Sequence, residues 1–179
     1  MSLGSSLVSE LERLASALQD DPGESARLSL PNIAERIARS IGVRADEVAI
    51  LGLSTRWSHL FFLVPESLRH TGFIPLSNTS AVAARTVRES RPEIINNFQA
   101  VRHHPVLQGG KIGSEPSATI QKMISAPIQR EGRTVGVIQI SRKGDTPASS
   151  GPDFSSEDLS KVVAICKPLG KLVQRVTGE

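Results

Sequence analysis

The sequence predicts a mixed α/β (α+β) fold built on one central antiparallel sheet of five to six strands. The main indication is a pair of apolar runs, residues 123–128 and 134–140, joined by the polar, glycine-containing segment 129–133. This pattern is typical of a β-hairpin. The second run is apolar on both faces, which places its strand inside a sheet that is covered on both sides. Apolar residues at helical spacing near both ends of the chain predict the covering helices.

Two amphipathic helices are expected before the first strand. Residues 8–18 repeat apolar side chains at helical spacing, and residues 30–41 form a second apolar stripe with Gly42 as the C-cap. We expect residues 1–28 to form an N-terminal helix and linker, and residues 29–179 to form a single domain. A helix-turn-helix is the alternative, but the connection over 20–27 is too long and too acidic for the usual short turn.

The middle of the chain predicts strands, a helix and a long loop. Runs 47–54 and 57–64, separated by Thr55-Arg56, indicate a hairpin, and residues 81–88 indicate a helix with a small-residue inner face. A short strand over 93–98 precedes a stretch without periodicity, 99–117. Loops of this length in compact domains are usually functional lids or disordered.

The last helix, expected over 156–176, carries two apolar stripes where packing on one sheet needs only one. The helix over 8–18 offers a third stripe with no obvious place in the core. We therefore expect a homodimer through the terminal helices that buries Leu11, Leu14 and Leu18 with Leu172 and Val176. In the alternative, the first helix folds back on its own domain and fills the second stripe.

Composition argues against several classes of partner. The chain of 179 residues is 39% hydrophobic, 22% charged and 3% aromatic, and 21 basic against 18 acidic residues leave a formal charge of +3 without a basic run. We expect no nucleic-acid partner, because aromatic rings are scarce and the basic excess is small and scattered. No apolar segment is long enough to span a membrane and the N-terminus does not resemble a signal peptide, so we expect a cytoplasmic protein.

Known chemical motifs are not found. The single cysteine, Cys166, leaves no intrachain disulfide and no multi-cysteine metal site. The adjacent His103 and His104 point in different directions in most conformations and have no nearby cysteine, so we expect no metal there and assign them to a lid over a pocket. No phosphate-binding loop, Ser-His-Asp set or paired carboxylates can be recognised. We expect neither a cofactor nor catalytic residues.

The order of these segments resembles the GAF domain, a family of small-molecule sensor domains with a GAF/PAS-like sheet. The resemblance runs from about residue 46 to residue 175 and rests on the hairpin 123–143, the helix and strand within 80–95, and the loop that ends before the last helix. It implies a stand-alone, bacterial-type sensor domain. It also implies that the terminal helices cover one face, while the helix 81–88 and the lid 99–117 enclose a ligand on the other.

One family signature is matched in part. Lys143, Phe154 and Asp158 fit the pattern of cyclic-nucleotide GAF domains, but Arg142 and Leu159 depart from it, so that ligand is not expected. The resemblance implies an ion pair between Lys143 and Asp158 and a buried Phe154.

The resemblance and the strand alternation together give a set of expected ligand-binding residues. They are Trp57, Asn97, Phe98, Arg102, His103, His104, Met123, Ser125 and Gln139. We expect a non-enzymatic domain that senses an unknown small molecule and signals through its terminal helices, with a signalling partner protein as a further possibility. GAF domains that attach bilins or reduce methionine sulfoxide use cysteines that Cys166 does not match. The alternatives are a protein-interaction or dimerisation module without a ligand, and an enzyme on the GAF scaffold.

Overall fold

The computed structural model describes residues 3–18, 23–100 and 119–178, and these residues contain one six-stranded antiparallel sheet. The strand order is β3-β2-β1-β6-β5-β4, so the long β5–β6 hairpin lies between the β1–β2 hairpin and the short edge strand β4. The predicted α+β class and antiparallel sheet are confirmed. The strands are β1 (Val48–Ser54), β2 (His59–Val64), β3 (Phe73–Pro75), β4 (Glu93–Ile95), β5 (Ile120–Arg130) and β6 (Arg133–Lys143).

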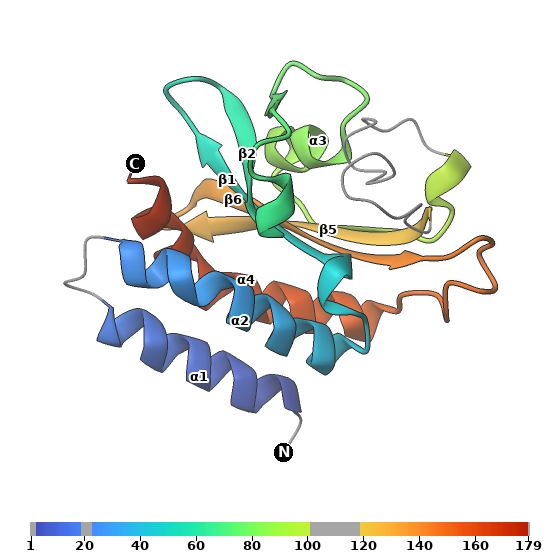
Figure 1. Ribbon diagram of the computed structural model, residues 1–179, viewed down its shortest axis with the longest axis horizontal. Coiled ribbons are helices and arrows are strands. Elements are labelled where there is room, and N and C mark those ends of the chain that lie inside the picture. Colours follow the sequence, from blue (N-terminus) through green and yellow to red (C-terminus); the bar gives the residue numbers. More distant parts are fainter. Residues whose placement is uncertain (1–2, 19–22, 101–118, 179) are drawn as a thin grey trace.

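The described ranges contain four α-helices, and three of them pack on the sheet (Figure 1). α2 (Glu24–Ile41) and α4 (Ser156–Thr177) pack on one face, and α3 (Val82–Glu89) packs on the other against β5 and β6. α1 (Leu3–Ala17) lies beyond α2 and α4, on their side away from the sheet. No described helix is both long enough and apolar enough to cross a membrane.

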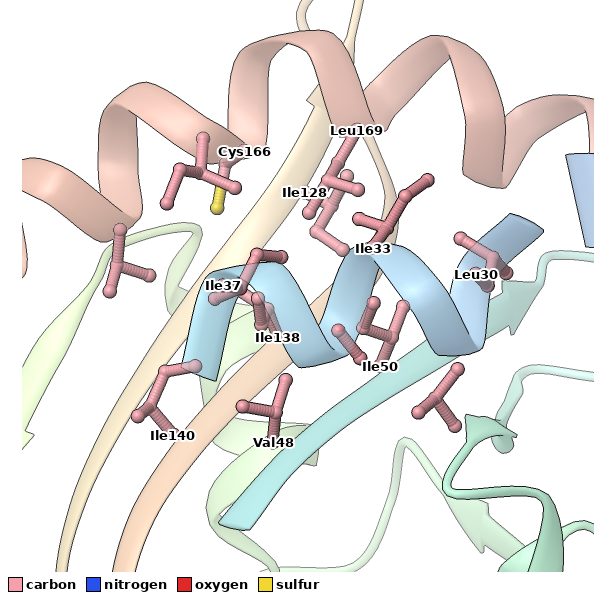
Figure 2. Close-up of a cluster of buried hydrophobic side chains, with 14 of the residues drawn as sticks. Leu30, Ile33, Ile37, Val48, Ile50, Ile128, Ile138, Ile140, Cys166 and Leu169 are labelled. Carbon is pink, nitrogen blue, oxygen red and sulfur yellow. The ribbon is translucent and has the colours of Figure 1, made fainter. Parts of the chain in front are cut away.

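The main core lies between the sheet and the pair α2 and α4 (Figure 2). Leu30, Ile33 and Ile37 of α2 point toward Cys166 and Leu169 of α4 and toward the strands. The strand residues of this layer alternate in sequence, as expected for one face of a sheet. They are Val48, Ile50, Ile128, Ile138 and Ile140, all buried.

Gly136 allows β6 to lie close to both β1 and α4. A Cβ atom at this position would collide with the carbonyl oxygen of Leu51 in the neighbouring strand and would lie 3.1 Å from Val173 of α4. The close approach that a glycine inside a strand predicts is therefore made by the protein itself.

α1 fills the apolar stripes that the sequence left without a partner. Leu7, Leu11 and Ala15 are buried against the α2 and α4 layer, and Leu172 of α4 is fully buried. The chain covers these stripes with its own first helix, which is the alternative that the sequence left open, and the homodimer through the terminal helices stays a prediction. The boundary expected at residue 29 lies within α2, which begins at Glu24.

The expected ion pair between Lys143 and Asp158 is absent, and both side chains have other partners. Lys143 Nζ donates to the carbonyl oxygen of Asp46, and Asp158 closes a capping box with Ser155 at the start of α4. A different lysine connects the sheet to this loop: Lys122 Nζ lies 3.0 Å from Asp153 Oδ1. The expected burial of Phe154 is confirmed, with 3% of the residue exposed.

Candidate functional site

Three polar side chains are buried together between α3 and the sheet, on the face opposite the terminal helices. Thr86 comes from α3, Ser125 from β5 and Gln139 from β6. Their exposed fractions are 1%, 0% and 2%. Ser125 and Gln139 are directly opposite each other in the β5–β6 ladder. We call these three residues the polar cluster.

The hydrogen bonds of the polar cluster run in one direction. Thr86 Oγ1 donates to the carbonyl oxygen of Val82 at 2.9 Å, so its only proton is used within α3. Ser125 Oγ, 2.7 Å from Thr86 Oγ1, must then be the donor of that pair. Gln139 Nε2 donates to Ser125 Oγ at 3.2 Å.

This series of hydrogen bonds leaves the side-chain oxygen of Gln139, a buried acceptor, without a partner. Gln139 Oε1 has no hydrogen-bond partner among the described residues. An unsatisfied buried polar group costs about 1–3 kcal/mol, so such groups are rare in native proteins and call for an explanation. A donor N–H or O–H group brought to this position would remove that cost.

Apolar clusters lie on both sides of the polar cluster. Val82, Phe98 and Met123 belong to one cluster, which also contains Ile95 and Ile120. Val137 belongs to a second cluster with the inner residues of β1, β2 and α3. The polar groups are therefore held in a low-dielectric environment, where a hydrogen bond is stronger than in water.

A two-point ion pair fixes α3 over this site. Arg85 Nε and Nη2 donate to the two carboxylate oxygens of Glu93, each at 3.0 Å. Glu93 pairs with Ser125 in the β4–β5 ladder, so the pair attaches α3 to the strand beside the polar cluster. Bidentate arginine–carboxylate contacts are the geometrically specific kind.

The structure does not bring the expected ligand-binding residues that it describes together at one place. Ser125 and Gln139 are in the polar cluster, and Phe98 and Met123 are buried in the adjoining apolar cluster. Asn97 is exposed, just before a short 3₁₀ turn. Arg102, His103 and His104 lie outside the described residues, as does most of the expected lid over 99–117.

The expectation that Trp57 lines the pocket is corrected. Trp57 is 64% exposed in the four-residue turn between β1 and β2, beneath the guanidinium of Arg56. The sequence suggested a two-residue turn, but Ser58 adopts a left-handed conformation with φ 52° and extends it. Trp57 therefore does not take part in the strand alternation that would direct it to a pocket.

Sequence reasoning missed Thr86. Thr86 follows Val82 by four residues and so lies on the inner face of α3, as helical spacing alone would have shown. The small residues around Thr86 were interpreted as a packing surface only.

Other reactive groups do not form a second site in the described part of the chain. No three His, Cys, Asp or Glu side chains there converge as metal ligands would. Cys166 is buried in α4 on the opposite face of the sheet, and burial raises the pKa of its thiol to about 12. A thiol in this state is unreactive at neutral pH.

The fold is that of a family of sensory and regulatory domains, and a family model identifies it. The GAF domain family model matches residues 27–173, from α2 to near the end of α4. The chain therefore belongs to the GAF domain family. No curated protein matches the chain in sequence.

Solved structures with the same fold have different functions. The GAF domain from Acinetobacter phosphoenolpyruvate-protein phosphotransferase is 17% identical, with a TM-score of 0.66 over 96% of this chain and 95% of that one. Residues 122 to 287 of a methyl-accepting chemotaxis protein are 16% identical, with a TM-score of 0.65 over 90% and 95%. Free methionine-R-sulfoxide reductase from Neisseria meningitidis, in complex with its substrate, is 17% identical, with a TM-score of 0.63 over 98% and 90%.

The last of these corrects the expectation that the chain is not an enzyme. A reductase shares this fold over nearly the whole chain, so membership of the fold gives no ground for excluding an enzymatic activity. At these identities the likeness describes the fold and leaves the chemistry to be argued from the site.

Proposed function

We propose that this domain senses a small molecule bound on the α3 face of the sheet and transmits its presence to the terminal helices. The observation that carries the proposal is the unpartnered acceptor Gln139 Oε1 in a buried cluster whose other groups are satisfied. The ligand would carry an N–H or O–H donor that bonds to this oxygen. Its remaining surface would be largely apolar, to match the neighbouring Phe98 and Met123.

The path to the output helices is short. Ser125 faces the polar cluster, and its neighbours Ile124 and Ala126 face the core with α2 and α4. A shift of β5 at the ligand therefore changes the surface on which α4 packs. α4 in turn holds α1, which gives the domain an element whose position can report binding.

Native mass spectrometry of the purified full chain tests whether a ligand is bound. The expected result is a retained small molecule in the wild type and its loss in Gln139→Leu, which keeps the size of the side chain but removes the acceptor. Gln121→Leu is the matched control, because Gln121 is also a buried strand glutamine but donates to the carbonyl oxygen of Gly144, away from the polar cluster. Retention by Gln139→Leu and Gln121→Leu alike would contradict the assignment of Gln139.

Hydrogen exchange tests the proposed output. If α1 reports binding, its amides exchange faster in Gln139→Leu than in the wild type with its retained ligand. A wild type that carries no small molecule, and α1 exchange that is equal in both proteins, would instead favour a protein-interaction module without a ligand.

A further inference from the structure

A groove of about 280 Å³ opens at the edge of the sheet, between α4, β5 and the chain that joins α3 to β4. Most of the lining residues that the structure describes are apolar: Pro92, Ala126, Pro127, Val163 and Cys166. We call it the edge groove. Its volume lies just below the usual range of small-molecule sites, so a ligand that fills it must be small.

Two prolines leave the edge groove open. The β4–β5 ladder ends at the pair Glu93 and Ser125. Pro92 comes directly before this pair on one strand, and Pro127 follows two residues after it on the other. Proline has no N–H group to donate to a ladder, so pairing stops here. β5 continues to Arg130, and on this side it has no neighbouring strand in the described part of the chain.

α4 supplies the second wall of the edge groove. Val163 and Lys167 are four residues apart on this helix, so their side chains lie side by side. Val163 is 45% exposed, whereas Cys166 is buried on the inner side of the groove. The valine therefore presents apolar surface to water beside an apolar hollow, and a ligand that covered both would remove this surface from water.

Lys167 determines which charge the edge groove prefers. Its ammonium is the one charged group among the described lining residues, and the residue is exposed. The methylene groups of a lysine can extend an apolar wall while the ammonium stays in water. An exposed ion pair contributes little energy, so Lys167 would orient a ligand and the apolar wall would supply most of the affinity. The matching ligand has an apolar body and one negative charge.

We propose that the edge groove binds a small amphipathic monocarboxylate. The apolar body lies between Pro127 and Val163, and the carboxylate lies at the Lys167 ammonium. Such a ligand contacts α4 and also the end of α3, because Ser90, the C-cap of α3, is a further lining residue. The polar cluster is on the face of the sheet away from α4, so this proposal does not depend on the proposed sensor ligand.

NMR titration of the isotope-labelled full chain with hydrocinnamate at low salt tests the proposal. We expect saturable binding, with the largest shifts at the amides of Ala126, Val163 and Lys167. Lys167→Gln should weaken binding about fivefold, since it removes one exposed charged contact. Val163→Ala should also weaken it about fivefold, because part of the apolar wall is lost. Both residues are exposed, so we expect both variants to fold, and thermal melts establish that they do.

Two controls separate a contact at Lys167 from an effect of net charge. Lys171→Gln removes the same charge one turn later on α4, where Lys171 is exposed and lines a different groove. Its affinity should stay within about twofold of the wild type. Hydrocinnamide, the neutral amide of the same acid, should bind the wild type about fivefold more weakly than hydrocinnamate does. It should bind Lys167→Gln and the wild type equally.

Four results would overturn the proposal. The first is no saturable shift at millimolar hydrocinnamate, and the second is an equal loss in the Lys167 and Lys171 variants, which would reflect net charge alone. The third is hydrocinnamide binding the wild type as tightly as hydrocinnamate, which would remove the role of Lys167. The fourth is a pattern in which the largest shifts occur at Thr86 and Gln139, which would assign the ligand to the polar cluster instead.

Discussion

Asn96 and Phe154 are joined by two hydrogen bonds, although they are far apart in the sequence. The backbone N–H of Phe154 donates to Asn96 Oδ1 at 2.9 Å, and Asn96 Nδ2 donates to the carbonyl oxygen of Phe154 at 3.1 Å. One side-chain amide thus fixes the loop before α4 to the residue that follows β4. The buried ring of Phe154 lies beneath the Arg142 guanidinium, 4.8 Å from it.

Asn96→Ala should lower the free energy of unfolding by about 1–3 kcal/mol, because both backbone groups of Phe154 lose their partner. Urea unfolding measures the loss. The control is Asn97→Ala: Asn97 is the exposed neighbour, and its removal should change stability by no more than about 0.5 kcal/mol. Equal effects of the two variants would contradict the role assigned to Asn96.

The framework of this fold could be predicted because its signals are local. The alternation in 123–140 placed Met123, Ser125 and Gln139 on one face of the sheet, and the structure has them there. Helical spacing likewise predicted the covering helices. Period-two and period-3.6 patterns depend only on neighbours in the sequence.

The predictions that failed depend on contacts between segments far apart in the sequence. Of two adjacent amides, the sequence reasoning favoured Asn97 and passed over Asn96, whose partner is 58 residues away. It paired Lys143 with Asp158 from a family pattern, whereas Lys122 reaches the loop before α4. Nor does a sequence pattern show that Gln139 Oε1 lacks a donor, since that depends on α3 and two strands at once.

Lys122 should matter more for stability than Lys143. The Lys122 side chain is 6% exposed, and its Nζ donates to the carbonyl oxygen of Gly151 at 2.6 Å in addition to pairing with Asp153. Lys122→Ala should cost about 1–3 kcal/mol, because it removes a charged donor from a part-buried carbonyl. Lys143→Ala removes only an exposed contact and should cost less than about 1 kcal/mol. A larger loss of stability in Lys143→Ala than in Lys122→Ala, measured by chemical denaturation, would instead support the ion pair between Lys143 and Asp158.

Cys166 should make stability fall at alkaline pH. Burial raises the pKa of its thiol from 9.0 to about 12, so above pH 9 the unfolded chain releases this proton while the folded chain keeps it. The contribution is fully present below pH 9 and is lost as the pH rises toward 12, at about 1.4 kcal/mol per pH unit. Unfolding measured at pH 8 and pH 10 should show a larger drop for the wild type than for Cys166→Ala. Parallel drops would contradict the burial of the thiol.

The position of α1 can be tested by removing its main contact and then the helix itself. Leu11 is 2% exposed between α1 and the α2 and α4 layer, so Leu11→Ala should cost about 2–5 kcal/mol. The control Leu28→Ala, on a 70% exposed residue of α2, should cost no more than about 0.5 kcal/mol.

A chain that begins at Gly23 keeps all of α2 but uncovers the surface that Leu7, Leu11 and Ala15 occupy. Light scattering should then detect more self-association than in the full chain, since an uncovered apolar face seeks a new partner. An equal association state for the two chains, together with an unchanged melting temperature in Leu11→Ala, would contradict the docking of α1 on its own domain.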